Sequence, residues 1–261
     1  MNAIITGAGR NKGIGAQICR SLAQKGINIY FTTFNEYDSK IANIKDSEYQ
    51  QTLEECRALG VDAHYRIFDL SKKSNVIDLF DNAITKLGSV EILINCLCYH
   101  NFDSLTEISE SQLEANLAVN SKSIFLLCQE FYKRFNGKIG RIVNFSSTQN
   151  LEPLSTEIAY AISKATVPII VSTLAPIMAS KGITINAINP GATETGNSFD
   201  RNINLYKEFN QFGRLGIPED SANVVCFLIS DEGKWITGQT INSEGGLFRG
   251  ITNIHTVETT K

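Results

Sequence analysis

Short apolar runs alternate along this chain with longer segments in which apolar positions recur at helical spacing. The apolar runs predict strands at 2–6, 28–32, 64–68, 92–95, 141–145, 184–188 and 239–242. The segments between them predict helices at 14–25, 48–59, 72–86, 110–135, 157–180 and 218–230. A long irregular segment is expected from the end of the sixth strand to Gly216.

This strict alternation, with strands that are apolar on both faces, predicts a parallel sheet covered on both sides. Right-handed crossovers then give an α/β fold, a single-domain, Rossmann-like doubly wound parallel sheet with helices on both faces. The sequence contains no internal repeat and no linker, so one domain is expected over residues 1–250. Residues 251–261 are polar and patternless, which indicates a tail or an interface arm.

The composition argues against two classes of function, nucleic-acid binding and membrane spanning. The formal net charge is −3 and no basic run occurs, which argues against nucleic-acid binding. The longest apolar stretch, 165–179, is interrupted by Pro168 and Pro176 and is too short to suggest a membrane span. A small-molecule enzyme is therefore the favoured class.

The expected compartment is the cytoplasm. A strand at the very start of the chain leaves no room for a signal peptide. The six cysteines form no C-x-x-C pair, so they are expected to be reduced thiols. Cys96 and Cys98 are one residue apart, but no second Cys/His pair accompanies them, and no metal site is expected.

A glycine-rich turn, from Thr6 to Gly15, follows the first predicted strand and opens the first predicted helix. Glycines let backbone N–H groups approach a pyrophosphate, and the helix N-terminus adds partial positive charge. A tight turn with nothing bound has a similar composition. Its position after the first strand favours dinucleotide binding.

Tyr160 and Lys164 are four residues apart in a predicted helix, so they lie on one face with the ammonium near the phenol. A free phenol titrates near pH ~10, and a cation within about 4–6 Å lowers that pKa by roughly 1–3 units. Such a tyrosine can exchange a proton as carbonyl reduction or alcohol oxidation requires. The pair alone is weak evidence, because many surface helices carry Tyr and Lys at this spacing.

Taken together, these motifs resemble the short-chain dehydrogenase/reductase (SDR) family, and the match runs from Asn2 to about Gly250. Gly7, Gly13 and Gly15 fit that family's T-G-x-x-x-G-x-G turn. The other matching positions are Asp69, Asn95, Asn120, Ser147, Tyr160, Lys164, Asn189-Pro190-Gly191 and the closing segment 235–246.

The resemblance implies a catalytic set of Asn120, Ser147, Tyr160 and Lys164. Ser147 would hydrogen-bond the substrate oxygen, Tyr160 would donate the proton, and Lys164 would lower the phenol's pKa and hold the nicotinamide ribose. Asn120 would steady a water that resupplies protons, although without the resemblance it is more typical of a helix kink or cap. The implied cofactor contacts are Gly7, Arg10, Lys12, Gly13, Ile14, Gly15, Thr33, Asp69, Leu70, Asn95, Tyr160, Lys164, Pro190, Gly191 and Thr193.

Two departures from the family pattern stand out. The glycine turn has five residues between Gly7 and Gly13 where the family has three, so the phosphate loop is expected to bulge. The family's N-N-A-G is here Asn95-Cys96-Leu97-Cys98, which is expected to crowd the floor beneath the adenine ribose.

Charge at the end of the second strand decides between NADP(H) and NAD(H). An acid there would repel a 2′-phosphate, but the position is Thr33, with no carboxylate before Glu36. Arg10 and Lys12 place two cations in the glycine loop, unless they are merely solvated. NADP(H) is therefore expected, with NAD(H) as the alternative.

The sequence does not identify the substrate. Enoyl-thioester reductases of the superfamily place six residues between Tyr and Lys, and Val167 occupies that position here, which favours carbonyl reduction. The whole-chain pattern is similar both to 3-oxoacyl-(acyl-carrier-protein) reductases and to sugar or other secondary-alcohol dehydrogenases. Lys138 and Lys181 fall where the acyl-carrier reductases place two cations. A non-catalytic dinucleotide-binding regulator is a further alternative, disfavoured because all four catalytic positions are retained.

The predicted helix 157–180 contains Pro168 and Pro176, which lack N–H donors and crowd the carbonyls of Lys164 and Ser172. A kinked or bowed helix is expected. In the family this helix and its neighbour 110–135 form a dimer contact, so the resemblance implies a homodimer or homotetramer.

Overall fold

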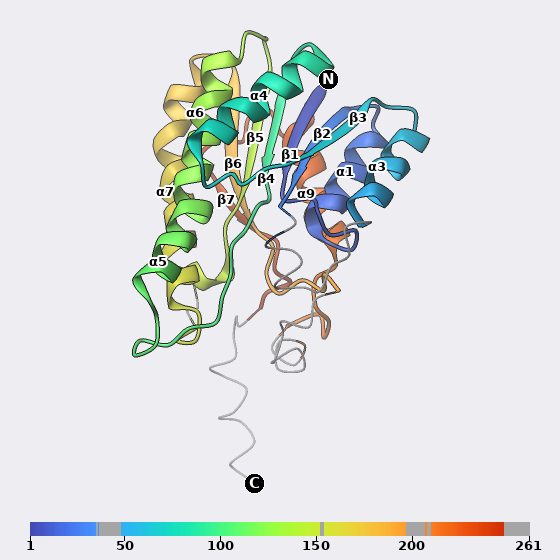
Figure 1. Ribbon diagram of the computed structural model, residues 1–261. Helices are drawn as coiled ribbons and strands as arrows, with labels where there is room; N and C mark the ends of the chain where they lie inside the picture. The colour runs from blue at the N-terminus through green and yellow to red at the C-terminus, as the bar shows by residue number, and fades with distance from the viewer. Residues whose placement is uncertain (35, 37–47, 152–153, 197–206, 208–209, 248–261) are drawn as a thin grey trace.

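The computed structural model describes residues 1–34, 36, 48–151, 154–196, 207 and 210–247. Within them a single seven-stranded sheet has the order β3-β2-β1-β4-β5-β6-β7, and every neighbouring pair is parallel (Figure 1). The strands are β1 Asn2–Thr6, β2 Asn28–Thr33, β3 Ala63–Ile67, β4 Ile92–Asn95, β5 Gly140–Phe145, β6 Ile183–Asn189 and β7 Thr240–Asn242. The order reverses between β1 and β4, where a doubly wound sheet binds its ligand.

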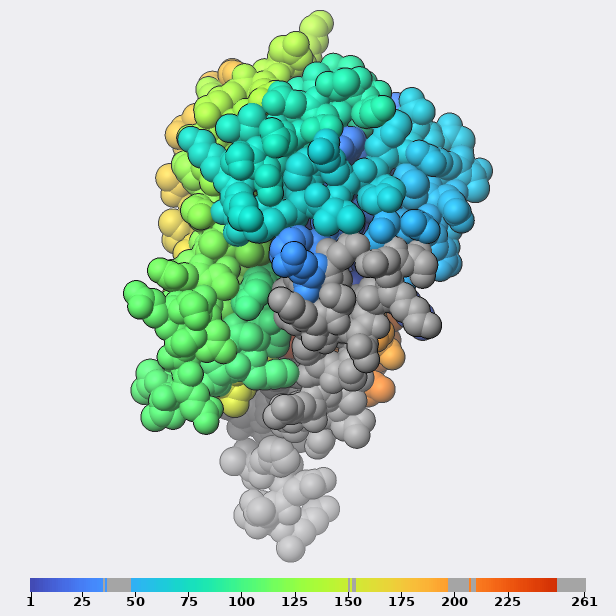
Figure 2. Space-filling view, viewed as in Figure 1, coloured from blue at the N-terminus to red at the C-terminus, as the bar shows by residue number. Residues whose placement is uncertain are grey.

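Helices cover both faces of the sheet, as predicted. They are α1 Ile14–Ala23, α3 Glu48–Ala58, α4 Lys73–Leu87, α5 Glu110–Leu117, α6 Ile124–Arg134, α7 Ile158–Ala179 and α9 Pro218–Ile229. One buried cluster joins α1, α3 and α9 to the sheet, and a second joins α4, α6 and α7 to the other face. In Figure 2, viewed as in Figure 1, α4 lies near the top of the molecule, with α3 to its right and α5 at the lower left.

The strands are buried on both faces, which explains their continuous apolar character. Ile4 of β1 belongs to the cluster under α4, whereas its neighbours Ala3 and Ile5 belong to the cluster under α1. Successive side chains of a strand point to opposite faces, so a strand with two covered faces needs apolar residues at every position. The predicted α/β fold class is confirmed.

Most predicted elements lie within a residue or two of their observed bounds, with one clear exception. The expected helix 110–135 is helical from Glu110 to Arg134, but its middle turn, Ala118–Ser123, is π-helical and divides it into α5 and α6. Apolar periodicity continues through this turn, so the sequence pattern gave no sign of it. The expected C-terminal tail, 251–261, lies outside the described residues.

Helix α7 runs without interruption through both prolines. The break in helical hydrogen bonding occurs in the neighbouring helix instead, and a bend of α7 at Pro168 or Pro176 stays a prediction. By length and composition α7, with a mean hydropathy of 1.5, is the one helix among the described residues that could cross a membrane. Its Val167 and Val171 are fully buried against the sheet, whereas Ile162, Ile169 and Ile177 are 49%, 66% and 49% exposed.

Candidate active site

The predicted site residues gather at the carboxyl ends of β1, β4, β5 and β6. Gly7 follows β1, Asn95 ends β4, and Ser147 comes two residues after β5. Pro190 and Gly191 follow β6 directly. The carboxyl ends of parallel strands meet at one edge of the sheet, so this convergence follows from the topology.

The glycine turn packs too closely to tolerate side chains. A Cβ on Gly7, which has φ +75°, would lie 2.6 Å from the Leu97 Cα, and one on Gly15 would lie 2.5 Å from the Gly7 carbonyl oxygen. Gly13 stands at the N-cap of α1 and offers no side-chain cap. The first N–H groups of α1 therefore face an open cradle that suits an anion.

The two extra residues of this turn form a fixed bulge. The Gly13 N–H donates to the Arg10 carbonyl at 2.9 Å and closes the turn. Asn11 anchors it, because the Arg20 guanidinium donates to the Asn11 side-chain oxygen at 2.8 Å and to its carbonyl at 2.9 Å. The Asn11 N–H in turn donates to Glu48 of α3 at 3.1 Å.

The two cations of the bulge lie against the segment that follows β6. The Arg10 guanidinium is 3.5 Å from the Thr195 hydroxyl, and the Lys12 side chain runs alongside Gly196. Thr33, at the end of β2, is 2% exposed, and its carbonyl accepts from the Phe68 N–H at 3.0 Å.

Two further cofactor positions follow β3. Ser71 donates to the Asp69 carboxylate through its N–H at 3.1 Å and its hydroxyl at 2.6 Å. Burial tends to raise the pKa of Asp69, but the bonds from Ser71 and the ammonium of Lys72 outweigh it and lower that pKa. Leu70 is buried, and its side chain belongs to the core.

The Asn95 side chain connects two neighbouring strands of the sheet. It is fully buried and donates to the Asn144 side-chain oxygen at 2.8 Å, which ties β4 to β5. Its side-chain oxygen has no hydrogen-bond partner among the described residues. The cysteines that follow lie near the glycine turn and the predicted catalytic residues: the charges of Lys164 and Arg10 act on Cys96, and Cys98 contacts Tyr160. The expected crowding at the adenine ribose stays a prediction.

Ser147, Tyr160 and Lys164 come together as predicted. The Ser147 hydroxyl hydrogen-bonds Tyr160 and also accepts the Gln149 N–H at 3.2 Å. Lys164 is 2% exposed, and its ammonium donates to the Phe145 carbonyl at 2.9 Å. A buried ammonium with three donors needs further acceptors, which the hydroxyls of a nucleotide ribose would supply. The open cradle of the glycine turn and this ammonium both fit a nicotinamide dinucleotide.

The electrostatics of Tyr160 differ from the expectation. Burial raises the pKa of its phenol well above the ordinary value, and Cys98 and Glu157 raise it further, against the lowering effect of the Ser147 hydrogen bond. The expected lowering by Lys164 does not prevail in the protein alone. Tyr160 therefore holds its proton at neutral pH, which suits a general acid.

Asn120 sits in the π-helical turn and is fully buried. Its side chain accepts the Tyr99 N–H at 2.8 Å and donates to the Tyr99 carbonyl at 2.7 Å and to the Ser163 hydroxyl at 2.9 Å. These contacts join the loop after β4 to the catalytic helix. The role expected for Asn120 in holding a water stays a prediction.

The segment after β6 packs against Glu244, which follows β7. A Cβ on Gly191, which has φ +65°, would lie 2.8 Å from Glu244. Asn189 accepts the Gly191 N–H at 3.1 Å and donates to the buried Glu244 carboxylate at 2.7 Å. Thr193 closes the segment with a bond from its hydroxyl to the Pro190 carbonyl at 3.1 Å.

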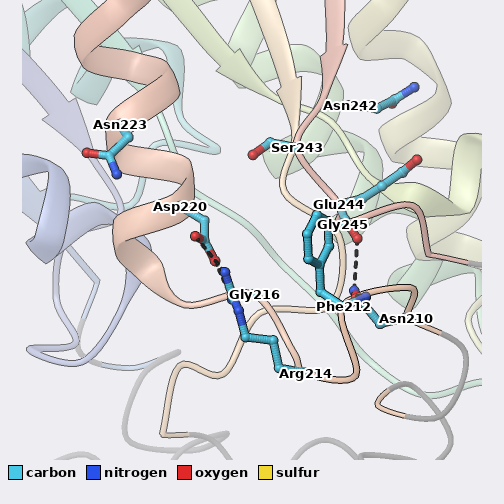
Figure 3. A pocket seen from close by; sticks show the side chains of 10 residues that line it. All are labelled: Asn210, Phe212, Arg214, Gly216, Asp220, Asn223, Asn242, Ser243, Glu244 and Gly245. Atoms are coloured by element: carbon cyan, nitrogen blue, oxygen red, sulfur yellow. Dashed lines mark hydrogen bonds and ion pairs between the residues drawn. The ribbon is translucent and has the colours of Figure 1, made fainter.

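A pocket of ≈ 320 Å³ lies on the other side of Glu244, between the start of α9 and the end of β7. In Figure 3, Asn210 donates to the Glu244 carbonyl, and Arg214 meets Asp220 across the pocket wall. The guanidinium of Arg214 holds the pKa of Asp220 below its usual range. The pocket contains none of the predicted catalytic residues.

Several residues at the site were not predicted from the sequence. Cys98, His100, Gln149 and Glu157 surround Tyr160, and Asp103 caps its helix. Cys98 had a signal, because it replaces the glycine of the family motif. The others had none, since their spacing in sequence says nothing about proximity. Among the described residues, no group of three or more His, Cys, Asp or Glu could hold a metal ion.

Comparison with known proteins identifies the family. A family model described as enoyl-(acyl carrier protein) reductase matches residues 7–248. The chain is 40% identical over 251 residues to the uncharacterised oxidoreductase YjdA of Bacillus subtilis, an alignment that covers 95% of this chain and 97% of that protein. It is 30% identical over 251 residues to a 3-oxoacyl-[acyl-carrier-protein] reductase of Staphylococcus epidermidis, covering 95% and 98%.

Solved structures agree with this family. A short-chain dehydrogenase from Burkholderia cenocepacia in complex with NADP has a TM-score of 0.84 at 26% identity, covering 93% of this chain and 96% of that one. A blue fluorescent protein from a metagenomic library, in complex with NADPH, also has a TM-score of 0.84, at 27% identity and with 95% and 97% covered. The chain belongs to the short-chain dehydrogenase/reductase family and is an oxidoreductase of that family, whose members bind a nicotinamide dinucleotide.

Proposed function

We propose that this protein uses NADP(H) to interconvert a carbonyl compound and a secondary alcohol by hydride transfer. The observation that carries the proposal is the Tyr160 hydroxyl, bonded to Ser147 and placed one helical turn from the buried Lys164. The four-residue spacing of Tyr160 and Lys164 supports carbonyl rather than enoyl reduction.

Each residue has a defined task in this proposal. Ser147 donates to the substrate oxygen and holds the carbonyl beside Tyr160. Tyr160 gives its proton to that oxygen as it becomes an alkoxide. Lys164 orients the cofactor through the ribose, and the Phe145 carbonyl fixes its ammonium. The nicotinamide, when bound, supplies or accepts the hydride.

The raised pKa of Tyr160 has a consequence for pH dependence. Reduction needs the protonated phenol, whereas oxidation needs the phenolate. With its pKa raised, the phenol stays protonated through neutral pH, so reduction is expected to decline only under alkaline conditions. Oxidation is expected to rise over the same alkaline range. Rates measured in both directions across pH would test this.

The choice of NADP(H) rests on the end of β2, where Thr33 leaves no carboxylate to repel a 2′-phosphate. The neighbours solved with NADP or NADPH support it. Arg10 and Lys12 contact the segment after β6. Their positive charge suits either the pyrophosphate or the 2′-phosphate of the cofactor, so it does not by itself favour NADP(H). NAD(H) remains the alternative.

A 3-oxoacyl thioester is one candidate substrate, supported by 30% identity to a reductase of that kind. Lys181, however, follows α7, about 30 Å along the helix axis from Tyr160. Its ammonium donates to the Tyr132 carbonyl at 2.8 Å and lies 4.3 Å from the Tyr132 ring centroid. An acyl carrier bound at Lys138 and Lys181 would therefore serve another copy of the chain. A sugar or other secondary alcohol is the alternative.

Oxidation of NADPH, followed with β-ketoacyl thioesters, ketosugars and aliphatic ketones, tests the proposal, with NADH measured in parallel. Turnover of any of them with NADPH preferred would support it. Binding of NADPH without turnover across all three classes would contradict it and favour a dinucleotide-binding regulator.

A further inference from the structure

A closed ring of side-chain contacts surrounds Tyr160. The Gln149 N–H bonds the Ser147 hydroxyl, and the Gln149 carboxamide donates to the Glu157 carboxylate at 2.6 Å. The same Glu157 oxygen lies 3.2 Å from His100 Nε2. The His100 ring meets the Tyr160 ring edge-on, with centroids 5.0 Å apart at 75°, and Tyr160 bonds back to Ser147. Every member thus contacts either the proton donor or a neighbour of it.

The ring is largely removed from water. The side chains of His100 and Glu157 are 18% and 13% exposed, and Gln149 is 8% exposed. A charge in such a place is poorly screened, so its effect on a neighbouring phenol is larger than that of a surface carboxylate.

Glu157 is free to join this ring because another residue caps its helix. Glu157 occupies the N-cap position of α7, yet its side chain makes no cap hydrogen bond. Instead Asp103 accepts the Ile158 N–H at 2.6 Å and the Ala159 N–H at 3.0 Å. The Glu157 carboxylate therefore turns to His100 and Gln149, three residues before Tyr160 on the same helix face.

Charged and titratable groups face Tyr160 from two elements. Glu157 and Lys164 come from α7, and Cys98 and His100 come from the loop after β4. The turn after β5 contributes only the uncharged Ser147 and Gln149. A carboxylate disfavours the phenolate, whereas an ammonium favours it.

We propose that Glu157 is a positioning residue for this active site: it holds His100 against Tyr160 and Gln149 beneath Ser147, and it places a carboxylate charge beside the phenol. Glu157 touches neither substrate nor cofactor and acts through its neighbours. The proposal rests on the proposed function only for its kinetic readout, because the same effect can be observed by titrating Tyr160 itself.

Glu157→Gln tests the charge while preserving the shape and the bond to Gln149. Removing the carboxylate favours the phenolate, so the pH at which alcohol oxidation reaches half its maximum should fall by about one unit. The alkaline decline of reduction should move by the same amount, with KM for substrate changed less than about twofold. Glu107→Gln, an exposed carboxylate that accepts from Ser104, is the matched control and should leave the profile unchanged.

His100→Phe tests the contact between His100 and Glu157. It preserves an aromatic edge against Tyr160 but removes the bond to Glu157. Without the imidazole donor the Glu157 carboxylate is held less firmly, so this variant should lower kcat for reduction while KM for substrate changes less than about twofold. An unchanged kcat would show that the contact positions nothing. This variant also keeps the proposal testable if Glu157→Gln fails to fold.

A second measurement, titration of the Tyr160 phenol, does not require enzyme turnover. Near-ultraviolet difference titration of Glu157→Gln against Glu157→Gln/Tyr160→Phe isolates the Tyr160 phenol, and the same pair in the parent background gives the reference. A lower titration pH in the Glu157→Gln background supports the proposal. Superimposable titrations, with the variants folded by circular dichroism, overturn it. Absence of turnover in the parent protein contradicts the proposed function but leaves this titration able to decide.

Discussion

At the scale of single residues, the behaviour of Tyr160 depends on what surrounds it more than on the Lys164 spacing that drew attention to it. Burial, Cys98 and Glu157 all favour the neutral phenol. Lys164, one turn away, is engaged by the Phe145 carbonyl. The neutral phenol is therefore favoured over the phenolate.

Tyr160→Phe removes the transferable proton but retains the ring against His100. We expect kcat to fall by about 10²–10⁴-fold, the usual contribution of general acid catalysis. Steady-state kinetics with the best substrate would measure the loss, and cofactor Kd should barely change. Retention of more than about a tenth of the parent turnover would remove Tyr160 from the mechanism.

Thr33→Asp places a carboxylate where a 2′-phosphate is expected. Because like charges at short range repel, the ratio of NADPH to NADH affinity should fall by at least about tenfold. Thr33 is buried, so Thr33→Asn serves as the uncharged control for packing changes. Fluorescence titration with both cofactors measures the ratio. An unchanged ratio would mean that the 2′-phosphate binds elsewhere or that NAD(H) is the native cofactor.

At the scale of elements, the catalytic helix depends on its neighbours for both its start and its orientation. Asp103 caps its first two N–H groups. The π-turn between α5 and α6 presents Asn120 to Ser163, in the middle of the catalytic motif. Both contacts come from segments that precede the helix by about forty residues or more in sequence.

Asp103→Ala should lower the free energy of unfolding by about 1 kcal/mol, as loss of an N-cap does. It should also lower kcat, because the start of α7 carries Tyr160. Asp103→Asn, which retains one acceptor oxygen, should recover part of both losses. Chemical denaturation and kinetics on the three proteins would test this, and equal stability of the parent and Asp103→Ala would show that the cap contributes nothing.

At the scale of the whole molecule, one surface is conspicuously apolar. Ile162, Ile169 and Ile177 lie on one face of α7 and are 49%, 66% and 49% exposed, and Phe125 of α6 is 41% exposed. Several large exposed apolar side chains on one helix face are typical of an interface. Together with the family resemblance, they support the predicted homodimer or homotetramer.

Light scattering at micromolar concentration should therefore give the mass of an oligomer. Ile169→Lys places a charge in the centre of this surface and should lower that mass. Leu59→Lys, at a similarly exposed position beyond α3, should not. A monomeric parent protein would contradict the prediction.

The sequence was sufficient for the features that depend on local pattern. Alternation of apolar runs and helical segments determined the parallel sheet, because strands covered on both faces must be apolar throughout. Topology then determined that Gly7, Ser147 and Gly191 would meet, since the carboxyl ends of parallel strands share one edge. The family motifs supplied the roles of Ser147, Tyr160 and Lys164.

Only the tertiary structure decided what lies beside those residues. The contact of Glu157 with His100, the cap from Asp103 and the bonds that occupy Asn120 join positions far apart in the chain, and no periodicity encodes such pairs. The protonation of Tyr160 depends on burial and on these neighbours. A spacing of four residues places Lys164 near the phenol, but the competition between desolvation, charges and hydrogen bonds is settled only in three dimensions.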